Sequence, residues 1–134
     1  MRRMLLALAL ALVLIALAVP AYAGSPHFVD DKVTFTVDGD TVTVVFKEAG
    51  LGDEDQVHVV LSGDAACVNP GGNKPQAANK ESFSAAGDFP VQNGRTEGSL
   101  SVTATFQPSC SPPMTVQWSN LVLTDETSGI STSP

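Results

Sequence analysis

The clearest pattern in the chain is an alternation of apolar residues with threonine over residues 32–47. Two alternating segments flank Asp38-Gly39, a dipeptide typical of two-residue hairpin turns. With these two residues as the loop, Phe35 faces Val42, and apolar and hydroxyl side chains separate onto opposite faces of the hairpin. The pattern predicts a β-hairpin whose core-facing residues are Val33, Phe35, Val42, Val44 and Phe46.

The same alternation recurs over residues 56–62, 99–106 and 115–124, and residues 82–86 could form a short edge strand. Asn93-Gly94 is a second signal for a tight turn. Glycine and proline recur between these segments, and no segment after residue 23 has ten residues of helical periodicity. The pattern predicts an all-β protein, an antiparallel β-sandwich of about seven strands with an immunoglobulin-like topology, and a small closed β-barrel is the alternative.

The N-terminal segment has the three parts of a secretory signal peptide. Arg2 and Arg3 precede 16 apolar residues at 4–19, and an A-x-A cleavage signal follows at 21–23. The apolar stretch is shorter than the roughly 20 residues that span a bilayer. We expect cleavage after Ala23, secretion without a stable membrane anchor, a single domain over residues 24–128 and a flexible tail over residues 129–134.

The negative net charge of the chain limits the kinds of partner that it is expected to bind. Loss of the two leader arginines changes the formal net charge from −7 to −9. An acidic surface disfavours nucleic acid and anionic membranes, whose phosphates require lysine and arginine. We expect a monomer that contacts an extracellular or cell-envelope partner.

Cysteine usage agrees with export. Cys67 and Cys110 are the only cysteines, and outside the reducing cytosol they are expected to form a disulfide. In the chain-entropy model, closing a loop of roughly 44 residues stabilises the fold by about 4 kcal/mol. We expect Trp118 in the core close to this bridge.

Three segments of the chain are similar to segments of other proteins. They are K-E-A-G-L-G at 47–52, C-V-N-P-G-G-N-K-P at 67–75 and W-S-N-L-V-L-T-D at 118–125. Together they resemble a group of uncharacterised short secreted bacterial proteins. The resemblance implies an extracellular compartment and a fold, but no activity, ligand or site residue.

The loop that follows Cys67 is a candidate ligand-binding loop, because a covalent anchor would present it rigidly from the scaffold. Its candidate residues are Asn69, Gly71, Gly72 and Asn73. The favoured alternative is a disulfide-anchored turn in which the glycines are structural.

Catalytic chemistry has little support, and we name no catalytic residue. After the leader, His27 and His58 are the only imidazoles, and no G-x-S-x-G nucleophile motif is present. We interpret His58 as an exposed strand residue. A small extracellular hydrolase that uses carboxylates from turns is the alternative to a binding protein.

We expect no cofactor, although calcium is a possible ligand. Clustered acids in predicted loops offer oxygen ligands, and two clusters could share one ion at one end of the sandwich. The candidate ligands are Asp38, Asp40, Asp53 and Asp55. Solvated turn acids are the favoured interpretation, and a calcium-stabilised structural module is a third functional alternative.

The outer face of the predicted hairpin is rich in hydroxyl groups. It carries Thr34, Thr36, Thr41 and Thr43, and a later strand carries Ser101, Thr103 and Thr105. Such a face could bind sugar, ice or another sheet edge, but threonine also suits any solvated sheet face. The leading hypothesis is a non-catalytic secreted sandwich that binds an unknown partner, with loops as its contact surface.

Overall fold

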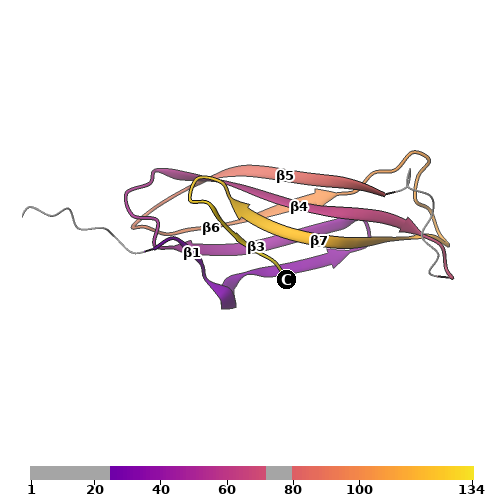
Figure 1. The fold of residues 1–134 in the computed structure, drawn as a ribbon, viewed down its shortest axis with the longest axis horizontal. Helices are drawn as coiled ribbons and strands as arrows, with labels where there is room; N and C mark the ends of the chain where they lie inside the picture. Colours follow the sequence, from indigo (N-terminus) through magenta and orange to yellow (C-terminus); the bar gives the residue numbers. More distant parts are fainter. Residues whose placement is uncertain (1–24, 72–79) are drawn as a thin grey trace, which may run out of the picture.

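The computed structural model describes residues 25–71 and 80–134. These residues form two four-stranded antiparallel sheets that pack face to face and do not close into a barrel (Figure 1). The predicted all-β antiparallel sandwich is therefore confirmed. The predicted leader, residues 1–23, lies outside the described residues, as do Gly72 and Asn73 of the candidate loop.

The first sheet, sheet A, is built around a long central strand. It contains β1 (His27–Phe28), β2 (Thr34–Asp38), β3 (Thr41–Ala49) and β6 (Thr96–Thr103). β6 pairs along one edge of β3, whereas β2 and the short β1 share the other edge. A 3-10 helix, η1 (Asp30–Lys32), connects β1 to β2.

The second sheet, sheet B, has the order β5-β4-β7-β8. Its strands are β4 (Gln56–Val68), β5 (Lys80–Pro90), β7 (Thr115–Asp125) and β8 (Ile130–Thr132). In immunoglobulin terms, β1/β2, β3 and β6 occupy the positions of strands A, B and E. β5, β4, β7 and β8 occupy those of C′, C, F and G, so within residues 25–71 and 80–134 the strand order follows the immunoglobulin arrangement, with no counterpart of strand D.

The β2–β3 hairpin has the predicted faces but a different loop. Asp38 pairs with Thr41, so the two loop residues are Gly39 and Asp40 rather than Asp38 and Gly39. Gly39 has φ 59° and opens the loop, which is the position that type II′ turns reserve for glycine. The register moves by two residues, so every side chain keeps its face. Val42, Val44 and Phe46 are 0% exposed, and Val33 and Phe35 are partly buried against them.

The second predicted turn is confirmed. Gln92 and Arg95 form a bridge, and the two residues between them, Asn93 and Gly94, both have positive φ values of 54° and 72°. This is the conformation that type I′ turns require.

The predicted flexible tail, residues 129–134, is corrected by the structure. Ile130–Thr132 forms β8, which pairs with the end of β7, and Ile130 packs against the core. Gly129 has φ 71° and allows the chain to reverse. The side chain of Asp125 accepts hydrogen bonds from the backbone N–H groups of Thr127 (2.9 Å) and Ser128 (3.1 Å), which fixes the turn.

The predicted disulfide is present and organises one end of the sandwich. Cys67 and Cys110 are bonded, with their Cα atoms 5.7 Å apart. The bridge packs in a small apolar cluster with Ala65, Ala104 and Phe106, and the partly buried Trp118 contacts this cluster as expected. The main core lies between the sheets, where the Phe46 ring meets Phe28 and Phe89 edge to face at centroid distances of 6.2 and 5.0 Å.

Candidate functional site

The outer face of sheet A presents hydroxyl groups in rows across three strands, and we call it the hydroxyl face. Strand pairing aligns its members as Thr34–Val45–Ser99, Thr36–Thr43–Ser101 and Asp38–Thr41–Thr103. Neighbouring strands lie about 4.8 Å apart, and alternate residues along a strand about 6.7 Å apart. The face is therefore a regular array, which the sequence predicted only as a set of threonines and serines on separate strands.

Hydrogen bonds within the rows hold several of these hydroxyls in place. Thr43 Oγ1 lies 2.8 Å from Ser101 Oγ, and Thr41 Oγ1 lies 3.0 Å from Thr103 Oγ1. Each hydroxyl can donate one hydrogen bond and accept others, so a pair that bonds internally keeps lone pairs for a ligand. Val45, 53% exposed, adds an apolar centre to the array.

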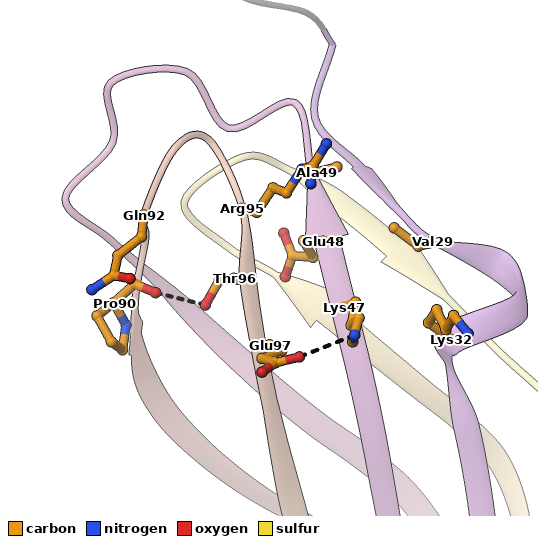
Figure 2. A pocket seen from close by; sticks show the side chains of 10 residues that line it. All are labelled: Val29, Lys32, Lys47, Glu48, Ala49, Pro90, Gln92, Arg95, Thr96 and Glu97. Atoms are coloured by element: carbon orange, nitrogen blue, oxygen red, sulfur yellow. Dashed lines mark hydrogen bonds and ion pairs between the residues drawn. The ribbon is translucent and has the colours of Figure 1, made fainter.

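A hollow of about 690 Å³ lies beyond the first row, and residues of both faces of sheet A line it. Lys47 and Glu97 pair in the next row, and their side chains form an ion pair at 3.2 Å. Figure 2 shows this pair below Thr96, whose hydroxyl donates to the Pro90 carbonyl at 2.8 Å. The hollow is also lined by Val29, Lys32, Glu48, Ala49, Gln92 and Arg95. It gathers three of the five basic residues that follow residue 23.

One of the residues that line this hollow is a buried acid. Glu48 on β3 is 1% exposed, and burial, followed by interaction with the Asp125 carboxyl, raises its pKa from 4.5 to about 8. Asp125 at the end of β7 is 0% exposed. Paired carboxylates are the arrangement that the hydrolase alternative requires, but almost none of either side chain is accessible, although Glu48 borders the hollow.

This pair was not identified from the sequence, although a signal for it exists. Glu48 continues the inward-facing alternation of Val42, Val44 and Phe46, so its position in the pattern is that of a core residue. An acidic side chain that points to the buried face of a strand must either pair with a hydrogen-bond donor or a cation, or carry a proton. Nothing in the sequence names Asp125 as that partner, because the contact joins different sheets.

His58 lies on the outer face of sheet B, half exposed, as its place in the strand pattern predicted. Its Nδ1 lies 2.8 Å from Asp88 Oδ1, and its Nε2 lies 3.9 Å from Glu126 Oε2. The hydrogen bond to Asp88 raises the pKa of the imidazole. Because both ring nitrogens face carboxylates, the ring is not arranged to activate a hydroxyl nucleophile.

The candidate calcium ligands are not brought together. Asp38 ends β2 and Asp40 lies in the turn that precedes β3, whereas Asp53 and Asp55 lie in the loop that follows β3. The nine residues of β3 separate these ends by about 30 Å, so the two clusters cannot share one ion. Among the described residues, no group of three or more His, Cys, Asp or Glu side chains is arranged to hold a metal.

The described part of the candidate ligand-binding loop is exposed. Asn69 and Gly71 follow the end of β4, directly after the disulfide. Glu48 lies near the end of β3, from which a short loop leads to Gln56 at the start of β4, whereas Cys67 lies near the end of β4. The candidate loop therefore starts at the end of the sandwich opposite Glu48.

Comparison with protein-family models, with curated proteins and with solved structures gives no match for this chain. Within residues 25–71 and 80–134, no helix has the length and apolar character needed to cross a bilayer.

Proposed function

We propose that this chain is a secreted, non-catalytic β-sandwich that binds a polysaccharide of the extracellular space or cell envelope through the hydroxyl face of sheet A. The observation that carries this proposal is the alignment of hydroxyls into cross-strand rows on one exposed face. This face replaces the loops that the sequence favoured as the contact surface.

Polysaccharide suits the chemistry of this face. Hydroxyls that both donate and accept hydrogen bonds match the hydroxyls of a sugar, and an apolar side chain such as Val45 can contact the C–H face of a sugar ring. A flat array also fits an extended polymer better than a small molecule, which favours an enclosed cleft.

The absence of aromatic rings from the described part of this face sets the expected affinity. All six phenylalanines and Trp118 belong to the apolar clusters or pack against them. Binding through hydrogen bonds alone gains little per contact, since each replaces a hydrogen bond to water. We therefore expect weak binding per site and stronger retention on a polymer that offers many adjacent sites.

The experiment is co-sedimentation of the purified protein with insoluble cellulose, chitin and the polysaccharide fraction of a bacterial envelope. The test variant carries Thr36→Val, Thr43→Val and Ser101→Ala, which removes the middle row of hydroxyls while retaining side-chain shape at the threonines. Loss of about 1 kcal/mol per hydrogen bond predicts at least tenfold weaker retention on the polymer that binds the wild type.

The matched control removes hydroxyls from the outer face of sheet B. It carries Ser62→Ala, Ser84→Ala and Thr124→Val, at positions on β4, β5 and β7. This variant should bind like the wild type. Equal loss in both variants, or full retention by the first, would reject the hydroxyl face as the contact surface.

A further inference from the structure

Glu48 and Asp125 form a carboxyl pair that links the two sheets inside the sandwich. Glu48 comes from β3 of sheet A and Asp125 from β7 of sheet B, and both are almost fully buried. Glu48 Oε1, Glu48 Oε2 and Asp125 Oδ2 have no hydrogen-bond partner among the described residues. Two ionised carboxylates here would leave three buried oxygens without a donor and would repel each other.

The two acids are not equivalent. Asp125 Oδ1 accepts hydrogen bonds from the backbone N–H groups of Thr127 and Ser128, at 2.9 and 3.1 Å. These bonds occupy Oδ1 and leave Oδ2 of Asp125 free to accept a hydrogen bond. Among the described residues, no donor reaches either oxygen of Glu48, so a single proton on this pair is best held by Glu48 and directed at Asp125 Oδ2.

We infer that Glu48 keeps a proton at neutral pH and shares it with Asp125, so that a carboxyl–carboxylate hydrogen bond fastens the β7–β8 turn to sheet A. One proton satisfies the unpartnered Asp125 oxygen and removes one of the two buried charges. A metal ion at the same place would need further oxygen ligands, since calcium takes six to eight.

The surroundings of Glu48 support a neutral acid. Its register neighbours, Phe28 on β1 and Thr96 on β6, carry no charge. Lys47 and Glu97 pair with each other on the outer face. The remaining charged groups near this end are exposed and do not govern its pKa, namely Asp30, Asp31, Lys32, Arg95 and, on the outer face of sheet B, His58 and Glu126.

The turn fastened by this proton has a second attachment on its outer side. The backbone N–H of Glu126 donates to the carbonyl of His58, and the N–H of His58 donates to Thr127 Oγ1, both at 2.9 Å. The imidazole of His58 also faces the Glu126 carboxylate. Raising the pH removes the proton from Glu48 on the inner side of the turn, which weakens its bond to Asp125. It also removes the proton from His58 on the outer side, which weakens its attraction to Glu126. The sandwich thereby contains a pH-sensitive fastening at the β7–β8 turn.

The test is infrared spectroscopy of the full mature protein, because the C=O band of a protonated carboxylic acid is separate from the carboxylate bands. At pH 7, where exposed acids are ionised, the wild type should show this band for about nine-tenths of one carboxyl group. Glu48→Gln should abolish it, whereas the control Glu54→Gln, at an exposed acid, should retain it. No band in the wild type, or a band that survives Glu48→Gln, would refute the inference.

Two further measurements distinguish a shared proton from protonation by burial alone and from a bound cation. Asp125→Asn keeps an oxygen for the two N–H donors and offers Glu48 an amide donor, so the band should disappear at lower pH than in the wild type. An unchanged pH would mean that burial alone protonates Glu48 and that no proton is shared. Thermal melts with calcium and with a chelator test for a cation: a midpoint raised by calcium in the wild type but not in Glu48→Gln would assign the site to a metal and overturn the proposal.

Discussion

Replacing Glu48 with glutamine should stabilise the protein at pH 9 and leave its stability almost unchanged at pH 4. The pKa of Glu48 is raised from 4.5 to about 8 by burial and by Asp125. A folded state that holds a proton more tightly than the unfolded state loses stability as the pH rises from the unfolded pKa to the folded one. For Glu48 this interval runs from pH 4.5 to about pH 8, and the contribution is constant above it.

The magnitude follows from the size of the shift. Each pKa unit corresponds to about 1.4 kcal/mol, so ionising Glu48 in the folded protein costs on the order of 5 kcal/mol at pH 9. This is comparable to the whole free energy of unfolding of a marginally stable domain. Glutamine cannot ionise and can still donate a hydrogen bond to Asp125, so the variant avoids this cost.

Urea denaturation at pH 4, 6, 7.5 and 9 measures the effect as a difference between wild type and variant at each pH, which cancels the contributions of other acids. The difference should favour Glu48→Gln increasingly between pH 4.5 and 8 and then level off. Glu54→Gln, at an exposed position, should show no such trend. A Glu48→Gln variant that is less stable than the wild type by the same amount at every pH would show that Glu48 is ionised in the folded protein.

Three other predictions follow from the fold. Alanine at both cysteines should lower the free energy of unfolding by about 4 kcal/mol in urea denaturation, and a loss below about 1 kcal/mol would contradict the role assigned to the bridge. Gly98→Ala should destabilise the sandwich by about 1–3 kcal/mol, because the new Cβ would overlap the Phe89 ring, and an unchanged denaturation midpoint would show that the ring moves freely. Asp88→Asn should lower the pKa of His58 in an NMR titration of the imidazole, since it removes the negatively charged hydrogen-bond acceptor; an unchanged titration would contradict that assignment.

The fold was predictable because period-two alternation is a local signal. In β3 it correctly identified Val42, Val44 and Phe46 as core residues, although the loop before them was assigned one residue early. The error arose because an Asp-Gly dipeptide fits two loop positions, and only the backbone conformation of Gly39 distinguishes them.

The tail and the edge strand depended on contacts that the sequence does not display. β8 exists because Asp125 caps a turn and Ile130 reaches the core, and both depend on where β7 ends. β5 extends from Lys80 to Pro90, well beyond the short strand predicted at residues 82–86, because pairing with the long β4 supplies hydrogen bonds along its whole length.

The candidate sites were the least predictable feature. The acid clusters that contain Asp38 and Asp53 have similar residues, but they lie at opposite ends of β3. The hydroxyl rows depend on strand register, and the Glu48–Asp125 pair depends on packing between sheets. A single sequence gives residue types and periodicity, whereas these sites arise from neighbours far apart in the chain.

The most direct test of the proposed function is an NMR titration of the isotope-labelled protein with soluble fragments of the polysaccharide retained in co-sedimentation. We expect amide signals to change along β2, β3 and β6, with the largest changes in the row Thr36–Thr43–Ser101. Changes confined to the loop after Cys67 or to sheet B, or no change at saturating fragment concentration, would contradict binding through the hydroxyl face.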